Sequence, residues 1–218
     1  PLSQTSQLPS QDLGVAPTLP PTALLNTPIP LAPRPHASHK GSWGDVAVVG
    51  GAPGMRGATL LAAAAALHAG AGRVFVAQLG GDPMTVDAAA PELMFRPLGA
   101  LDLRGLHVAC GCGGGDAVRE VLPALLSNAR SLVLDADALN AIAADTHLQT
   151  LLRARNARSD RPTVMTPHPL EAARLLGTGA ADVQSNRLAA ARRLVERFGG
   201  VVVLKGSGTV IASPSATP

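Results

Sequence analysis

Hydrophobic residues after residue 45 form short unbroken runs, which alternate with longer segments rich in helix-forming residues. The runs predict strands at residues 46–49, 73–77, 106–109, 132–134, 163–165, 201–204 and 209–212. The longer segments predict helices over 58–69, 116–129 and 136–144, from Pro169 onward, and over 184–198. Strands without a polar face are buried on both sides, as in a mostly parallel sheet. We therefore predict an α/β fold of three layers, with helices on both faces of such a sheet.

Residues 1–38 follow a different pattern. They hold nine of the nineteen prolines in the chain, and Asp12 and Arg34 are their only charged residues. Proline lacks an amide hydrogen and fixes φ, so this segment cannot form a regular helix or an inner strand. We predict that residues 1–38 are an extended linker or arm and that residues 39–218 form the folded domain.

Composition excludes several classes of protein. Apolar residues make up 46% of the chain and charged residues 15%, which is the opposite of a disordered composition. Aromatic residues make up only 2%, so the bases of a nucleic acid would find few rings on which to stack. The net charge of +3 is spread along the chain. We therefore expect no nucleic-acid partner.

One local cluster of arginines stands out from this even spread. It consists of Arg153, Arg155, Arg158 and Arg161, with Asp160 among them. A nucleic-acid footprint would normally be a longer stripe or run of basic residues. We interpret the cluster as the solvated end of a helix and the loop that follows it.

Neither a membrane span nor a cysteine framework is indicated. The longest apolar stretch, residues 58–66, is far shorter than the roughly 20 residues that cross a bilayer. No basic-then-apolar signal peptide opens the chain. Cys110 and Cys112 form a lone Cys-x-Cys, which is too little for a zinc site or a disulfide framework. We expect two small buried thiols in a reducing compartment and a cytoplasmic protein without membrane contact.

In parallel α/β sheets, ligands bind beyond the carboxyl ends of the strands. Polar residues and glycines follow several of the predicted strands at that edge. They are Gly50, Gly51, Gly54 and Gly57 after the first strand; Asp135, Asp137 and Asn140 after residues 132–134; Thr166, Pro167 and His168 after residues 163–165; and Lys205, Gly206, Ser207, Gly208 and Thr209 after residues 201–204. This edge of the sheet is therefore the candidate site.

The first two of these groups each have more than one interpretation. The spacing of Gly51, Gly54 and Gly57 suits an anion at a helix N-terminus or a plain tight turn, and it matches neither the dinucleotide fingerprint nor the P-loop. Asp137 is a candidate site residue or the N-cap of the next helix. Asp135 either holds a magnesium ion through water or fixes a neighbouring loop.

The last two groups of residues also have more than one interpretation each. His168 lies between two prolines, so its backbone is stiff, and it either contacts a substrate or makes a structural hydrogen bond. The turn from Lys205 to Thr209 combines a cation, two glycines and two hydroxyls. It is either a phosphate cradle built from backbone N–H groups and the lysine, or a hairpin loop.

A series of motifs runs through the domain. It comprises His39-Lys-Gly-Ser-Trp-Gly44, Gly50-Gly-Ala-Pro-Gly-Met-Arg-Gly-Ala58, Pro91-Glu-Leu-Met94, Gly111-Cys-Gly-Gly-Gly115, Val133-Leu-Asp-Ala-Asp-Ala-Leu-Asn140, Thr166-Pro-His-Pro169 with Glu171, and Leu204-Lys-Gly-Ser-Gly-Thr209. From about His39 to Ala212 this series resembles the ADP-dependent NAD(P)H-hydrate dehydratase family, nucleotide repair enzymes of the ribokinase-like superfamily. The resemblance implies a three-layer ribokinase-like fold.

The resemblance also implies a reaction. Family members dehydrate the S-hydrate of NADH or NADPH at the expense of ADP, with Mg²⁺ as the implied metal. Phosphoryl transfer to the ring hydroxyl creates a leaving group, and phosphate then departs. No residue of this sequence is assigned as a metal ligand.

By position, the resemblance assigns two groups of binding residues. The hydrated nucleotide would be lined by Ala58, Gly113, Gly115 and His168. The ADP phosphates would be held by Lys205, Gly206, Ser207, Gly208 and Thr209, near the supporting strand-end residues Asp135, Asp137 and Asn140. Bifunctional members carry an epimerase domain joined by a Pro-rich stretch, which would explain residues 1–38. We also expect a homo-oligomer.

The sequence departs from the family pattern in two places. The family continues to a Gly-Thr-Gly-Asp segment whose Asp is the base, and the 218 residues contain no such segment, since Gly177-Thr-Gly179 is followed by Ala180. Cys112-Gly-Gly114 stands where relatives usually carry Pro-Gly-Leu.

The first departure leads us to expect an incomplete C-terminus, an absent catalytic aspartate and little dehydratase activity from these residues alone. Two alternatives remain open. One is another ribokinase-like small-molecule kinase, and the other is a non-catalytic nucleotide-binding module.

Overall fold

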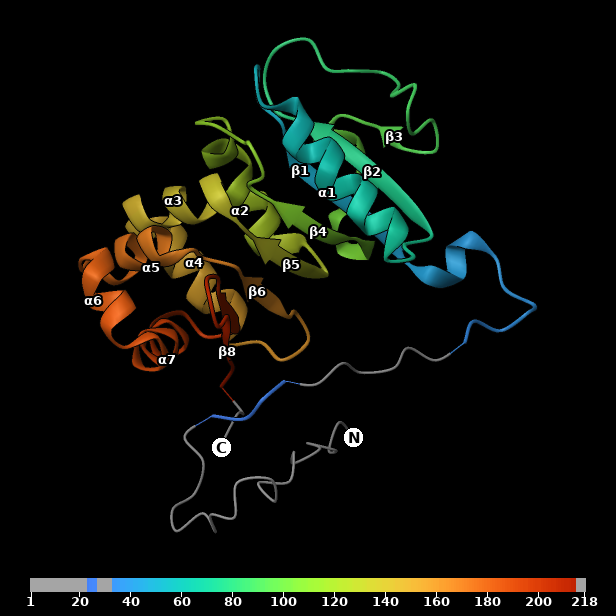
Figure 1. The fold of residues 1–218 in the computed structure, drawn as a ribbon. Helices are drawn as coiled ribbons and strands as arrows, with labels where there is room; N and C mark the ends of the chain where they lie inside the picture. Colours follow the sequence, from blue (N-terminus) through green and yellow to red (C-terminus); the bar gives the residue numbers. More distant parts are fainter. Residues whose placement is uncertain (1–22, 27–32, 215–218) are drawn as a thin grey trace. The chain divides into compact units, whose positions relative to one another are not determined.

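The strands form one sheet in the order β3-β2-β1-β4-β5-β6-β7-β8, and every neighbouring pair is parallel except the antiparallel pair β7–β8 (Figure 1). The computed structural model describes residues 23–26 and 33–214. The strands are β1 Asp45–Gly50, β2 Arg73–Gln78, β3 Met94–Phe95, β4 His107–Cys110, β5 Ser131–Leu134, β6 Thr163–Met165, β7 Val201–Leu204 and β8 Val210–Ala212. The prediction of a mostly parallel sheet is confirmed.

Helices connect most of the parallel strands. They are α1 Arg56–His68, α2 Val118–Asn128, α3 Ala136–Ala144, α4 Thr146–Asn156, α5 Pro169–Leu176, α6 Ala180–Ser185 and α7 Arg187–Phe198. Short 3₁₀ turns lie at η2 Lys40–Trp43, η3 Leu98–Ala100 and η4 Leu103–Gly105. No helix in the described part of the chain is both long and apolar enough to cross a bilayer.

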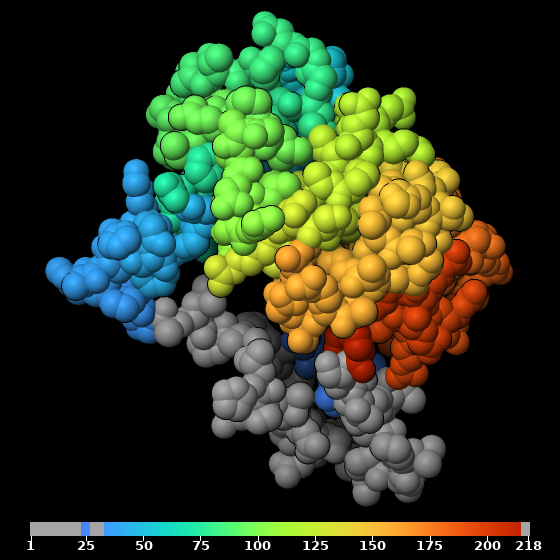
Figure 2. All heavy atoms as spheres, turned by 180° about the vertical axis from the view of Figure 1, so that it is seen from behind, coloured from blue at the N-terminus to red at the C-terminus, as the bar shows by residue number. Residues whose placement is uncertain are grey.

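Alternate strand residues face two separate apolar clusters, which makes three layers. On one face, Val48, Val74 and Val76 pack with Ala63 of α1. On the other face, strand residues such as Val108 pack with α2, α3, α4, α5, α6 and α7. Figure 1 shows α1 along β1 and β2, and Figure 2 shows the segments from residue 110 onward packed side by side. Helices on both faces of the sheet are therefore confirmed.

The two faces are not covered equally. The strand register places Val133 and Ile211 on the same face as α1. Among the described helices, α1 is the one that packs on this face, and it lies over β1 and β2. Val133 is 39% exposed and Ile211 51%, although both are strand residues. Beyond α1, this face therefore carries apolar side chains that are open to solvent.

The element bounds differ from the prediction in several places. The predicted helix 184–198 is divided into α6 and α7 at Asn186, whose backbone leaves the helical region and whose side chain accepts a hydrogen bond from Ala189 N at 3.0 Å. Strand β3 was not predicted, and of helix α4 only the end, at the arginine cluster, was expected. Asp145 caps α4 by accepting from His147 N at 2.8 Å, which is the signal that a polar helix begins there.

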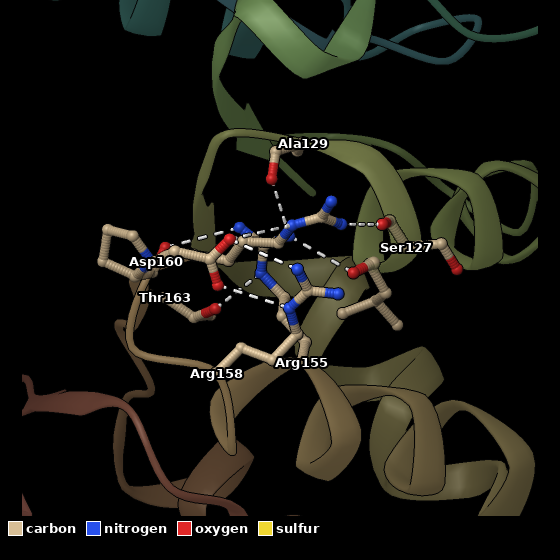
Figure 3. Close-up of polar contacts among 9 residues, drawn as sticks. Ser127, Ala129, Arg155, Arg158, Asp160 and Thr163 are labelled. Atoms are coloured by element: carbon tan, nitrogen blue, oxygen red, sulfur yellow. Dashed lines mark hydrogen bonds and ion pairs between the residues drawn. The ribbon is translucent and has the colours of Figure 1, made fainter.

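The interpretation of the arginine cluster as a solvated surface is wrong for Arg155, which is 3% exposed. It donates to Leu126 O at 3.2 Å, Ala129 O at 2.8 Å and Thr163 Oγ1 at 2.8 Å (Figure 3). Burial, with a smaller effect of Arg161, lowers the pKa of Arg155 to about 10, so the guanidinium stays charged at neutral pH. This arginine joins the end of α2 to the start of β6.

The prediction of a linker falls mostly outside the described residues. Residues 39–214 form one compact unit. Of the segment before it, residues 23–26 and 33–38 are described, and their side chains are exposed. The assignment of residues 1–38 as a linker stays a prediction.

Candidate functional site

Loops that follow parallel strands share the carboxyl edge of the sheet, and here they are joined through their backbones. The loop after β1 pairs with the loop after β4, because Gly51 N donates to Cys112 O at 3.1 Å and Ala52 N donates to Gly113 O at 2.7 Å. The register Val49↔Cys110 brings the two loops together at this point. The two glycine-rich motifs found in the sequence therefore form one surface.

Asp137 connects this surface to the loop after β5. Its Oδ2 atom accepts from Gly115 N at 2.9 Å, and its own N donates to Gly111 O at 3.3 Å. The N-cap interpretation of Asp137 is wrong, because Asp135 holds the N-cap position of α3. Asp137 instead shapes the glycine turn, which brings a predicted substrate-site glycine and a strand-end carboxylate together.

Asp135 is the centre of the polar edge. Its Oδ1 atom accepts from Lys205 Nζ at 2.5 Å and from Thr166 Oγ1 at 2.8 Å. Burial raises the pKa of Asp135, but the hydrogen bonds from Lys205 and Thr166 outweigh it, so that the pKa lies below its ordinary value and the carboxylate is charged. One carboxylate thus links the loops after β5, β6 and β7.

Lys205 begins the turn that leads to β8. The guanidinium of Arg187 is a second cation that contacts this turn. Arg187, at the start of α7, donates to Leu204 O at 2.9 Å and Lys205 O at 3.2 Å. Thr209 Oγ1 donates to Gly206 O at 3.1 Å, while Gly206, Ser207 and Gly208 are exposed. The turn is fixed at its base and open at its tip.

Sequence reasoning missed Arg187. It lay inside a helix that was predicted to run unbroken from residue 184. Asn186 was the signal that could have found it, because asparagine is a favoured N-cap and would start a new helix at Arg187. A helix that starts there places a basic side chain beside the end of β7.

His168 makes structural hydrogen bonds, and its contact with a substrate stays a prediction. Its Nδ1 accepts from Leu170 N at 3.1 Å, and its Nε2 lies 3.2 Å from Glu171 Oε1. Glu171 Oε2 in turn accepts from His168 N at 2.8 Å, which completes a capping box. The His168 side chain is 46% exposed, so its ring remains reachable from solvent.

Ala58 and Asn140 are two further predicted site residues, and they lie in different parts of the structure. Ala58 lies in the first turn of α1, and a Cβ placed on Gly113 would approach its Cβ to 3.1 Å, so the two residues are neighbours. Asn140 lies on α3, where its Oδ1 accepts from Arg174 Nη1 at 2.7 Å. The structure gives Asn140 a helix–helix contact and does not join it to the Asp135 cluster.

The described residues contain no group of three or more His, Cys, Asp or Glu side chains that could hold a metal ion. Mg²⁺ often needs fewer protein ligands, because it keeps several waters and binds one or two carboxylates together with substrate phosphates. The side-chain hydrogen bonds that Asp135 and Asp137 accept fall on Asp135 Oδ1 and Asp137 Oδ2, and the Asp135 carboxylate also accepts from the backbone of Ala136. These two carboxylates fit a magnesium ion that arrives with a nucleotide.

Both thiols near the site are expected to react slowly in the folded protein. Burial raises the pKa of the Cys110 thiol to about 12, and burial followed by the charge of Asp135 raises the pKa of Cys112. At about pH 8 the thiolate fraction of Cys110 is then roughly a thousandfold below that of an ordinary thiol. Titration with a chromogenic disulfide before and after addition of urea measures this, and Cys112→Ser isolates Cys110. Reaction of native Cys110 at the rate of free glutathione would contradict it.

Comparisons with known proteins identify the family. The family model described as NAD(P)H-hydrate dehydratase matches residues 46–217. The ADP-dependent (S)-NAD(P)H-hydrate dehydratase of Neisseria meningitidis is 44% identical over 189 residues, which are 83% of this chain and 62% of that protein. The bifunctional NAD(P)H-hydrate repair enzyme Nnr of Escherichia coli is 38% identical over 84% of this chain and 35% of its own length. The chain thus spans about three fifths or less of these two relatives.

Solved structures agree on the fold. The ADP/ATP-dependent NAD(P)H-hydrate dehydratase of Bacillus subtilis, co-crystallised with ATP/Mg²⁺, superposes with a TM-score of 0.68 at 27% identity, over 84% of this chain and 65% of that one. A ribokinase-like superfamily protein of Enterococcus faecalis gives the same TM-score at 23% identity over 84% of this chain and 64% of its own, which supports the fold alone. The family model, the identity to the Neisseria protein and the superposed fold agree, so this chain belongs to the NAD(P)H-hydrate dehydratase family.

Proposed function

We propose that the protein repairs hydrated NAD(P)H by ADP-dependent dehydration, and that the described residues supply its nucleotide-holding edge. The observation that carries the proposal is the contact of Lys205 Nζ with Asp135 at 2.5 Å, within a cluster that joins three strand-end loops. A fixed cation beside open backbone N–H groups is the arrangement that holds phosphates. Membership in the dehydratase family supports the reaction.

Each group of residues then has a part in the reaction. Gly206, Ser207 and Gly208 would bind the ADP phosphates, while Asp135 holds the Lys205 ammonium in place beside them. The surface made by Ala58 and the glycines after β4 would receive the hydrated ring. With reactants held side by side, phosphoryl transfer depends on positioning and on charge stabilisation.

Mg²⁺ would enter with the nucleotide. We propose that Asp135 and Asp137 hold it through carboxylate oxygens, directly or through water. The ion would neutralise charge on the phosphates. The Bacillus subtilis relative was co-crystallised with ATP/Mg²⁺, which supports this choice of nucleotide and metal.

Lys205→Met is expected to weaken ADP binding by about tenfold or more, because a charged hydrogen-bond donor to the phosphates is lost. Lys40→Met is the matched control, since it makes the same substitution in an exposed lysine before β1, at the other edge of the sheet. Isothermal titration calorimetry with ADP and Mg²⁺ measures both. Equal affinity of Lys205→Met and the parent chain would contradict the phosphate role of Lys205.

Activity is tested by incubating the protein with the S-hydrate of NADH, ADP and Mg²⁺ and following the recovery of NADH absorbance. The 218 residues contain no Gly-Thr-Gly-Asp segment, so we expect little turnover from them alone. A fusion that adds the part of the Neisseria relative that this chain does not cover should turn over the hydrate, and Lys205→Met in that fusion should slow it. ADP binding by a folded fusion without any turnover would contradict the dehydratase proposal and indicate a nucleotide-binding module.

Two expectations about the whole protein remain proposals. Several relatives are bifunctional repair enzymes, which supports an epimerase domain encoded upstream of Pro1. We also expect the protein to be a cytoplasmic homo-oligomer. Sequencing upstream of this chain tests the first, and light scattering of the purified protein tests its oligomeric state.

A further inference from the structure

Arginines gather at the amino edge of the sheet, opposite the edge that carries the nucleotide site. Arg104, Arg130 and Arg161 each precede one of the neighbouring strands β4, β5 and β6 by a few residues. Because these strands are parallel, their starts meet at the same edge. There the three arginines, together with Asn128 and Asp160, line a cavity of about 260 Å³.

The inner guanidinium groups around this cavity are bound by the protein itself. Arg155 donates to carbonyls at the end of α2, and Arg161 donates to Ser127 O in the same turn. Arg158 pairs with Asp160 at 3.2 Å (Figure 3). Cations at a helix C-terminus satisfy its free carbonyls and complement its dipole. These contacts fix the position of Arg161, which lines the cavity, and of the nearby Arg155 and Arg158.

The two outer arginines are different. Arg104 and Arg130 are exposed, and within the described ranges their guanidinium groups have no hydrogen-bond or ion-pair partner. Asp160 is the one carboxylate among the residues that line the cavity. Burial is the largest cause of the lowered pKa of Arg155, but repulsion from Arg161 and Arg158 adds to it, and Asp160 offsets only part of this repulsion. The cavity therefore carries an excess of positive charge.

We propose that this cavity binds a compact anion of the phosphate class, of which inorganic pyrophosphate is the probe of suitable size. The planar fork of guanidinium matches phosphate oxygens, and Arg104 and Arg130 have donors available for them. The arginines surround one hollow rather than forming a stripe, which favours a compact anion over a nucleic-acid strand. The site lies beyond the amino ends of the strands and does not depend on the proposed dehydratase activity.

Arg104→Gln/Arg130→Gln tests the proposal in the 218-residue protein. Both side chains are exposed, so we expect unchanged circular dichroism and thermal unfolding. Calorimetry should show pyrophosphate binding to Lys205→Met without added ADP, because this substitution weakens the nucleotide site, whereas the diphosphate of ADP would compete for the cavity. The double variant should lose about tenfold or more in affinity for pyrophosphate, because two charged donors are removed.

The control variants distinguish pyrophosphate binding in this cavity from a general effect of net charge and from binding at the nucleotide site. Arg153→Gln/Arg193→Gln removes the same charge from exposed positions of α4 and α7 and should bind pyrophosphate as the parent does. Lys205→Met should also keep this binding while it loses ADP affinity. The proposal is overturned if Lys205→Met does not bind pyrophosphate in the absence of ADP, or if both double variants weaken equally. Displacement of bound pyrophosphate by a single-stranded oligonucleotide of equal phosphate concentration would overturn the choice of a compact anion.

Discussion

Gly111→Ala is expected to lower the free energy of unfolding by about 4 kcal/mol, or to prevent folding. Gly111 has φ +117°, a region that L-residues rarely adopt. A Cβ at this position would lie 1.9 Å from Asp135 O and 2.8 Å from Ala138 Cβ. Both neighbours belong to the start of α3, so neither can move away as a flexible side chain would. The substitution must push α3 away from β4.

Urea unfolding measures this change, and Gly57→Ala is its control. Gly57 lies in α1 next to the same site, and a Cβ there meets nothing within 4 Å. Alanine inside a helix is expected to be up to about 1 kcal/mol more favourable than glycine. The same Gly→Ala substitution is therefore expected to lower the free energy of unfolding at residue 111 and to raise it at residue 57. A Gly111→Ala protein as stable as the parent would show that the loop after β4 has freedom to rearrange.

Arg155→Ala is expected to lower the free energy of unfolding by about 3 kcal/mol. The guanidinium fills a buried position and satisfies Leu126 O, Ala129 O and Thr163 Oγ1. Without it, three buried oxygen atoms lose a charged donor, and the space left by the side chain is not filled. Arg155→Lys should also be destabilising, because one ammonium cannot reproduce the geometry of the fork.

Arg153→Ala is the matched control for this prediction, because Arg153 lies two residues away on α4. Its side chain is exposed and, among the described residues, donates to Thr150 Oγ1 alone, so the change should stay within about 0.5 kcal/mol of the parent. Thermal and urea unfolding compare the two variants. A loss of the same size in both would mean that Arg155 contributes to stability through net charge alone.

The strands and the site edge could be predicted because both depend on short local patterns. Apolar runs such as residues 46–49 contain no polar position, and this allows burial on both faces. The rule for parallel sheets then places Asp135 and Lys205 at one edge, although they are seventy positions apart in the sequence. Their contact is a consequence of strand order and direction, which alternating strands and helices already imply.

What could not be predicted depends on tertiary packing. Arg155 lies in a stretch of arginines that is typical of a solvated surface, and only the meeting of α2 with β6 encloses it. For His168 the flanking prolines predicted a stiff backbone and left open a substrate contact or a structural hydrogen bond, and the sequence could not show that Glu171 would engage its ring. In both cases the partner is decided by how a side chain is enclosed or turned, which no local pattern encodes.

The unequal covering of the sheet has a consequence for local opening. β1 lies between α1 on one side and the other helices on the second, so its amide hydrogens should exchange with solvent slowest. Among the described strands, β8 stands last in the order and pairs with β7 alone, and it carries the half-exposed Ile211. Its amides should exchange fastest among the described strands. The turn from Lys205 to Thr209 joins β7, which pairs with a strand on each side, to β8, so the predicted phosphate cradle lies beside the strand that is expected to open most readily.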